Sequence, residues 1–356
     1  MEGKAMRGWI RSLWRKLGSP KTGVGRAASR KPALEALEDR SVPTITMTIL
    51  TAQLVQNHAS PPVPILSFTD TNNVGGNSSL YQVSINWNDG SALDTATGGV
   101  ILKASTADGG TFQVLGDHIY TSAGSFPVTI TLHSNLDNTN NTAYSIANVE
   151  TANQHFVESL YQSLLHRPVD PTGLKAWTTQ LDQGASRSQV VFEIEESGEY
   201  RMDVIGGLYA KLLNRAVDPS GSATWNAFLA HGGTVEQLEA VIIGSGEYFA
   251  RRGGGTNGGW LQAVYQDVLN RGIDVNGLQT WSHDLIFGFT RGHIAQLIIN
   301  NAEGFQVEVQ TFYQQFLNRN ADSDGLNHFV AAMLQGTRRE PVIAGILGSD
   351  EYFSNF

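Results

Sequence analysis

The chain of 356 residues contains no cysteine. This absence excludes disulfide frameworks, thiolate zinc sites and cysteine nucleophiles. No apolar run approaches the roughly 20 residues that a membrane-spanning helix needs, so we expect a soluble body. The signatures of serine hydrolases, zinc proteases and P-loop proteins are also missing. The sequence therefore predicts a protein with no catalytic activity of its own and no cofactor.

Charge is distributed unevenly along the chain. The first 40 residues hold ten Lys and Arg against four Asp and Glu, and the rest holds fourteen against twenty-nine. Residues 6–17 of this basic leader place apolar side chains at helical spacing. Such a segment suits an anionic membrane surface, nucleic-acid phosphates or an export leader. We favour the leader, although it lacks the apolar core of a standard signal peptide. We expect no nucleic-acid partner, and membrane contact only through this segment.

Residues 34–43, LEALEDRSVP, follow the leader. They resemble the Leu-Glu-x-Leu-Glu-x-Arg motif found near the start of planctomycete-type exported and surface proteins. The alternative interpretation is a short solvated helical turn. The resemblance implies a bacterial protein located outside the cell or on its surface. We expect residues 1–44, which hold the leader and this motif, to be mostly disordered.

Residues 45–150 differ in composition, with one Lys, no Arg and many Thr, Ser, Asn and Gly. Apolar side chains alternate with polar ones over 81–87 and 126–132, which predicts strands with one buried face. Turn sequences that contain Gly separate these segments. Short strands at such intervals predict a β-sandwich.

Two segments of this region, INWNDGS at 85–91 and GDHIYTSAGSFPVTITL at 116–132, resemble the polycystic-kidney-disease (PKD) type of immunoglobulin-like module. The residues that carry the resemblance are Trp87, Asp89, Gly90, His118, Tyr120, Gly124 and Phe126. The resemblance implies an immunoglobulin-like sandwich in which His118 packs near Trp87 and binds no metal. Asn88 stands where the family usually has Gly, which makes that turn less typical.

The rest of the chain repeats one phrase, Arg-x-x-Asp-x-x-Gly-x-x-x-aromatic, four times at intervals of 48, 56 and 48 residues. Such a period predicts a helical array built from equivalent units. The extra length of the middle interval falls in a Gly-rich segment. We therefore predict an all-α array of four repeats, with repeats 1 and 2 in 151–252, a linker at 253–259, and repeats 3 and 4 in 260–356.

Each repeat is predicted to contain three short helices. Gly184, Gly232, Gly288 and Gly336 are expected to end the second helix, and capping boxes of Ser186 with Gln189, Thr234 with Gln237 and Thr337 with Glu340 are expected to open the third. The phrase Ser-Gly-Glu-Tyr at 197–200 and 245–248, and related phrases at 301–304 and 349–352, are expected to close the third helix. The Asp of the repeated phrase suits a helix N-cap, and the Arg is expected to pair with the Glu that closes the third helix of the same repeat. The aromatic residue is expected to enter the core. The residues of this predicted structural motif are Arg167, Asp170, Gly173, Trp177 and Glu199, then Arg215, Asp218, Gly221, Trp225 and Glu247, then Arg271, Asp274, Gly277, Trp281 and Glu303, then Arg319, Asp322, Gly325, Phe329 and Glu351.

Calcium binding is the alternative use of the loop. Asp274 with Asn276, and Asp322 with Asp324, place oxygen ligands as in the first half of an EF-hand loop. The bidentate Glu expected further along is absent, so we favour capping over a metal. Nine scattered histidines, His155 and His166 among them, are interpreted as packed or solvent-facing. The acidic run from 193 to 196 is interpreted as a solvated helix face.

The repeated units resemble domain-of-unknown-function family 4214 over about 200 residues. Ser222, Phe305 and Phe329 depart from its usual wording. The resemblance implies an extracellular accessory module and no reaction. We expect a non-catalytic structural or adhesive protein that binds a cell-surface protein or polysaccharide. The alternatives are an accessory module of a carbohydrate-active enzyme and a calcium-stabilised adhesin.

Overall fold

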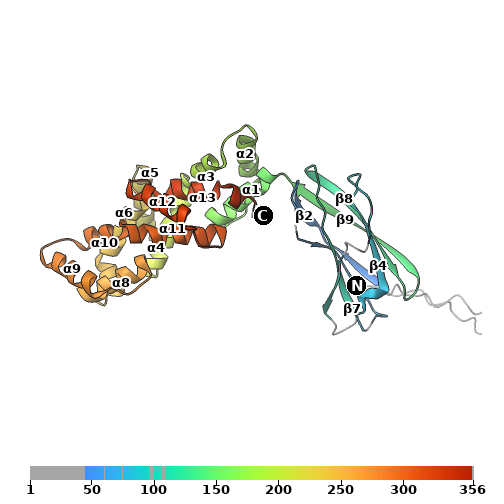
Figure 1. Cartoon of the computed structure of the whole chain (residues 1–356), viewed down its shortest axis with the longest axis horizontal. Helices are drawn as coiled ribbons and strands as arrows, with labels where there is room; N and C mark the ends of the chain where they lie inside the picture. Colours follow the sequence, from blue (N-terminus) through green and yellow to red (C-terminus); the bar gives the residue numbers. More distant parts are fainter. Residues whose placement is uncertain (1–44, 60, 74, 96–99, 106–109, 355–356) are drawn as a thin grey trace, which may run out of the picture. The chain divides into compact units, whose positions relative to one another are not determined.

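The structure, a computed structural model, describes residues 45–354 apart from residues 60, 74, 96–99 and 106–109. The predicted leader and the motif at 34–43 lie outside the described residues. An N-terminal β region is followed by a helical region, as the sequence predicts (Figure 1). No helix among the described residues has the length and apolar character needed to cross a membrane.

Nine strands form two sheets within the described part of the β region. They are β1 (Ile45–Ile49), β2 (Ala52–Val55), β3 (Val63–Asp70), β4 (Tyr81–Asn86), β5 (Asp94–Thr95), β6 (Val100–Ser105), β7 (Gly110–Gly116), β8 (Gly124–Ser134) and β9 (Thr139–Glu150). One sheet has the order β1-β3-β7-β6, and the other has the order β2-β9-β8-β4-β5. Neighbouring strands are antiparallel except β2 and β9, which are parallel.

The two sheets contribute to one buried apolar cluster. Phe68 and Phe112 come from the first sheet, and Val83, Ile130 and Ala147 come from the second. Along β8 the buried residues alternate with partly exposed ones, so the strand has one inward face. The predicted alternation is therefore present in this strand.

Five of the residues that carry the PKD resemblance form one chain of contacts: Asp89, His118, Trp87, Tyr120 and Phe126. The His118 ring stacks on Trp87 with centroids 4.9 Å apart, and His118 Nε2 lies 2.7 Å from Asp89 Oδ2. The Tyr120 hydroxyl donates a hydrogen bond to the Trp87 carbonyl. Partial burial opposes ionisation of Asp89, but hydrogen bonds from His118 and Ser91 outweigh it and hold the pKa of Asp89 below its usual range.

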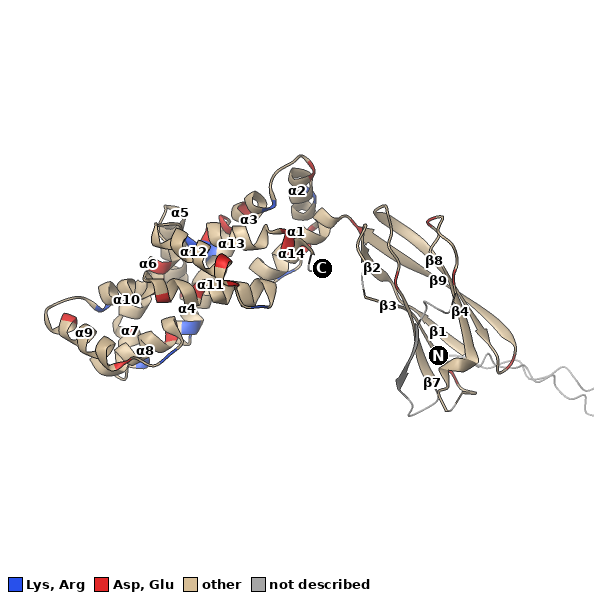
Figure 2. Ribbon diagram, in the orientation of Figure 1, with Lys and Arg blue, Asp and Glu red and all other residues tan. Residues whose placement is uncertain are grey.

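The helical region contains helices from α1 to α14. They are α1 (Ala152–Leu165), α2 (Pro171–Asp182), α3 (Arg187–Glu195), α4 (Gly198–Leu213), α5 (Pro219–Ala230), α6 (Val235–Gly244), α7 (Gly246–Arg251), α8 (Asn257–Leu269), α9 (Val275–Ile286), α10 (Arg291–Ile299), α11 (Ala302–Leu317), α12 (Ser323–Leu334), α13 (Arg339–Leu347) and α14 (Asp350–Ser354). Figure 2 shows acidic and basic residues interspersed along these helices.

Two separate cores hold the helices together, and they are nested in the sequence. The first core combines residues from 156–200 with residues from 305–352. The second core combines residues from 205–248 with residues from 260–299. Accordingly, α3 packs on α13 and α6 packs on α10 (Figure 1). The predicted grouping, with a division at 253–259, does not match these cores, because the second core takes residues from both sides of that segment.

The Gly-rich segment is a structured turn. Helix α8 begins at Asn257, so the connection is shorter than the predicted linker. The amide of Gly255 donates to the carbonyl of Phe249, and a Cβ at Gly253 would lie 2.8 Å from the Trp260 Cα. Gly254 and Gly255 have positive φ values, which glycine adopts without steric cost. The glycines therefore serve a tight turn between packed helices.

Helix boundaries differ from the prediction at the Ser-Gly-Glu-Tyr phrases. Ser197 does not close the preceding helix; its side chain accepts the Tyr200 amide and caps the start of α4. Ser245 likewise caps α7. Helix α4 then continues to Leu213, so one helix joins two consecutive units. Another difference lies at α13, whose N-cap is Arg338, without a side-chain cap; the predicted capping box of Thr337 does not form.

Candidate functional site

Each repeated loop begins where a helix ends in a left-handed residue. His166, Asn214, Asn270 and Asn318 have φ values of 53, 50, 53 and 51°. Asn tolerates this conformation better than most residues, because its short polar side chain can bond locally. The turn reverses the chain and brings the Arg of the phrase beside the preceding helix.

The Arg of each loop makes the same set of contacts. In the first three loops its Nε and Nη2 atoms donate to the two carboxylate oxygens of the predicted Glu at 2.5 to 2.9 Å. The fourth loop has the same two-pronged pair between Arg319 and Glu351. In every loop, Nη1 donates to the carbonyl of the next residue. The guanidinium also lies over a Tyr ring, 4.9 to 5.0 Å from its centroid.

The partner Glu is not at the end of the third helix, where the sequence analysis placed it. Glu199 lies in the first turn of α4, and Glu303 lies in the first turn of α11. A carboxylate there also interacts favourably with the positive end of the helix dipole. The hydrogen bond from the Arg is the main cause that lowers the pKa of all four Glu residues.

The Asp of each loop is the N-cap of the following helix, as predicted. Its Oδ1 accepts the amide of the Gly three residues later in all four loops, at 2.8 to 3.0 Å. In the first loop, Asp170 also accepts the Thr172 amide. In the third loop, Asp274 also accepts a hydrogen bond from Arg271. The backbone amide of the Gly is the first cause that lowers the pKa of Asp170, Asp274 and Asp322.

The Gly and the aromatic residue of the phrase enclose a Tyr hydroxyl. Trp177, Trp225 and Trp281 each donate Nε1–H to the hydroxyl of the Tyr 16 residues earlier, at 2.8 to 2.9 Å. A Cβ at Gly277 would lie 2.6 Å from the Tyr265 hydroxyl oxygen. The Phe329 side chain has no N–H donor, and its ring packs edge-on against the Tyr313 ring. The packed Tyr therefore excludes a side chain at Gly173, Gly277 and Gly325, whereas at Gly221 the atoms nearest an added Cβ belong to Asp218 and Val217.

The calcium candidates lie on the exposed first turns of two helices. Asp274 and Asp322 use Oδ1 as a helix cap, and their Oδ2 atoms face Arg271 and Arg319 at 3.1 and 3.5 Å. Asn276 and Asp324 are exposed beside them. The carboxylate oxygens of Asp274 and Asp322, which a calcium ion would need as ligands, are thus already bound to backbone amides or lie against guanidinium groups.

One acidic residue is buried where the sequence analysis expected a solvated face. Glu195 is 2% exposed, so its carboxylate is removed from solvent. Burial, and then the charge of Glu340, raise the pKa of Glu195 to about 9. The interpretation as a solvated face is wrong for this residue, because α3 packs on α13 and covers it.

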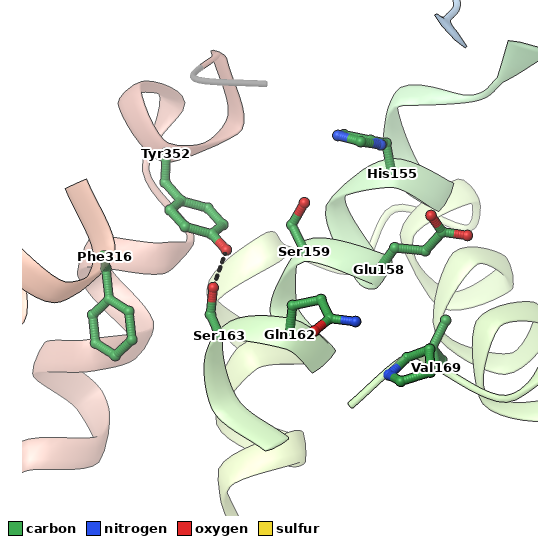
Figure 3. A pocket seen from close by; sticks show the side chains of 9 residues that line it. His155, Glu158, Ser159, Gln162, Ser163, Val169, Phe316 and Tyr352 are labelled. Carbon is green, nitrogen blue, oxygen red and sulfur yellow. Dashed lines mark hydrogen bonds between the residues drawn. The ribbon is translucent and has the colours of Figure 1, made fainter. Parts of the chain in front are cut away.

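A cavity of about 520 Å³ lies beside α1 (Figure 3). Its lining includes His155, Glu158 and Gln162 from α1, with Phe316 from α11 and Tyr352 from α14. Among the described residues, the one group of three side chains placed to hold a metal ion is Glu150, His155 and Glu158. No prediction from the sequence included this group. The available signal is His-x-x-Glu at 155–158 in a helical segment, with Glu150 five residues before the His.

Comparison with known proteins gives one family. The model of the family Domain of unknown function (DUF4214) matches residues 139–204 and 307–356. The helices of both matched segments contribute to the first core. The search of curated proteins and the search of solved structures found no match to this chain.

Proposed function

We propose that the helical region is built from four copies of one unit, each related to the DUF4214 family. The support is the recurrence of the whole loop geometry, which includes the Arg–Glu pair, the Asp cap and the ring under the guanidinium, at all four positions. The two segments that match the family model contain the first and fourth loops. The second and third loops share their geometry.

We also propose that residues 45–150 form an immunoglobulin-like β-sandwich of the PKD type. Two sheets that share one apolar cluster support this assignment. Three of the residues that carry the PKD resemblance also contact one another: His118 stacks on Trp87, and Asp89 lies against the His118 imidazole. We propose that the motif at 34–43 marks the chain for export.

We propose that the protein is an exported, non-catalytic structural or adhesive protein that presents its surface to a protein or a polysaccharide outside the cell. The observation that carries this proposal is the internal use of the repeated polar residues. Each loop Arg, Asp and Glu bonds within its own loop and adjacent helix start, and this arrangement joins helices. The phrase is therefore a structural device, and recognition is assigned to the remaining surface.

Fractionation of native cells tests this proposal. We expect the protein in the extracellular or cell-surface fraction, with accessible sites cleaved when intact cells are treated with protease. A binding screen on arrayed polysaccharides and on isolated cell envelopes then tests adhesion. Recovery of the protein only from the cytoplasm, protected from protease until lysis, would contradict the proposal.

A further inference from the structure

The junction between β9 and α1 brings three potential metal ligands together. Glu150 is the last residue of β9, and His155 and Glu158 lie about one turn apart on α1 (Figure 3 labels the last two). One ligand atom from each side chain lies within 4.8 Å of the other two. His155 Nδ1 lies 3.5 Å from Glu150 Oε2.

Local structure fixes this arrangement. Thr151, between the strand and the helix, forms a capping box with Gln154 in which each side chain accepts the amide of the other residue. The box fixes Glu150 relative to the first turn of α1. His155 and Glu158 are three residues apart, so their side chains share one helix face. The three ligands therefore come from a short, well-defined stretch of chain.

The two carboxylates lie close together, because one oxygen of each is within 4.8 Å of the other and of a His155 ring nitrogen. The three side chains are only partly exposed, so solvent screens the repulsion between the two negative charges incompletely. A positive charge between the carboxylates removes this repulsion.

We propose that Glu150, His155 and Glu158 bind one divalent transition-metal ion, for which zinc is the best match. One imidazole nitrogen with two carboxylates suits zinc better than calcium, which prefers oxygen ligands throughout. Zinc holds such ligands at about 2.0 to 2.2 Å, so the three atoms need to draw together by roughly 1 Å. Side-chain rotation at these partly exposed positions supplies that movement.

Three protein ligands leave a fourth position of a tetrahedral ion for water or an incoming ligand. His155 and Glu158 also line the adjoining cavity, where Ser159 and Gln162 offer polar groups. The Ser163 and Tyr352 hydroxyls, which also line the cavity, are hydrogen-bonded at 2.9 Å. An ion at this position would thus face a cavity large enough for a small oxygen-bearing ligand. This inference is independent of the proposed function.

Calorimetric titration of the full-length, chelator-treated protein with zinc chloride tests the site. We expect one zinc ion per chain and a zinc-dependent rise in the melting temperature. His155→Gln and Glu158→Gln should each weaken binding roughly tenfold or more, because each removes one ligand. Cobalt as a spectroscopic probe should give a visible absorption band that His155→Gln alters.

His166→Gln is the matched control, because His166 also lies near a carboxylate, 3.4 Å from Asp203, without a third ligand. It should bind zinc as the wild type does. Equal loss in the control, stoichiometric binding that survives both ligand substitutions, or no binding at all would overturn the proposal. Tighter binding of calcium than of zinc would overturn the assignment of His155 as a ligand. Circular dichroism of each variant separates loss of a ligand from loss of folding.

Discussion

At the residue scale, the repeated phrase is a set of mutually dependent contacts around one Tyr. The Arg lies on the Tyr ring, the Gly leaves space for its hydroxyl, and the Trp donates a hydrogen bond to that hydroxyl. The Asp cap and the Arg–Glu pair are predictable from the sequence, because both follow from charge, spacing and side-chain shape. The role of the Tyr hydroxyl is not, because it depends on how two helices cross.

The contribution of the Tyr hydroxyl to stability can be measured by removing it from two units, one in which a Trp donates a hydrogen bond to it and one in which a Phe takes the place of that Trp. Tyr265→Phe should lower the free energy of unfolding by about 1 kcal/mol, because it leaves Trp281 Nε1–H without its acceptor. Tyr313→Phe should cost less, since Phe329 in that unit donates no hydrogen bond. Urea unfolding of both variants gives the comparison. Equal losses would show that the hydrogen bond contributes nothing beyond packing.

The buried Glu195 predicts an unusual pH dependence. Its pKa of about 9 in the folded protein lies above its ordinary value of 4.5. The folded state therefore binds this proton more tightly, and stability falls as the pH rises from about 4.5 to about 9. Glu195→Gln should remove this component and raise the melting temperature more at pH 8 than at pH 5. A shift of the same size at both pH values would show that the carboxyl is not protonated in the fold.

At the scale of the element, glycine has opposite roles at two helical positions. A Cβ at Gly325, in the first turn of α12, would lie 2.3 Å from the Tyr313 hydroxyl oxygen. Gly207, within α4, has no such neighbour within 4 Å. The same substitution should therefore have opposite signs at the two sites.

Gly325→Ala should destabilise the protein by about 1 to 3 kcal/mol through overpacking. Gly207→Ala should stabilise it by up to about 1 kcal/mol, because alanine favours helix. Adding Tyr313→Phe to Gly325→Ala should recover much of the loss, since the colliding oxygen is gone. Thermal unfolding followed by circular dichroism measures all three. A stabilising Gly325→Ala would contradict the proposed reason for that glycine.

Element boundaries show where local sequence is informative and where it is not. Asp218 and Gly232 mark the start and end of α5 correctly, because capping and a positive φ are local requirements. Ser197 was assigned to the end of a helix although it caps the next one. When two helices are joined by a single turn, the sequence alone does not show whether a Ser in that turn ends the first helix or caps the second.

At the scale of the whole molecule, the order of the units along the chain is not the order of their packing. The outer units form one core and the inner units form the other. The sequence predicts a grouping of consecutive units instead, because glycines at 253–255 resemble a linker. Which helices pack together depends on how well their apolar faces fit each other. A single sequence does not reveal that fit, so it leads to the prediction that neighbouring units pack together.

Fragments of the helical region distinguish the two groupings. A fragment of residues 197–301 contains the whole second core, so it should unfold cooperatively on heating. A fragment of residues 151–252 contains half of each core and should lack a cooperative transition. Circular dichroism and calorimetry of the two fragments give the answer. Cooperative unfolding of 151–252 alone would mean that consecutive units form a core in solution.

The contact between the first and last helices has a topological consequence. Phe156 of α1 lies beside Phe353 of α14, with ring centroids 5.7 Å apart. The helical region thus closes on itself, because its outer units share one core. Consider a circular permutant in which the two ends of the helical region are joined and the chain is opened at 253–255. It should keep both hydrophobic cores, but its outer units would then be consecutive in sequence and its inner units would lie at the two ends.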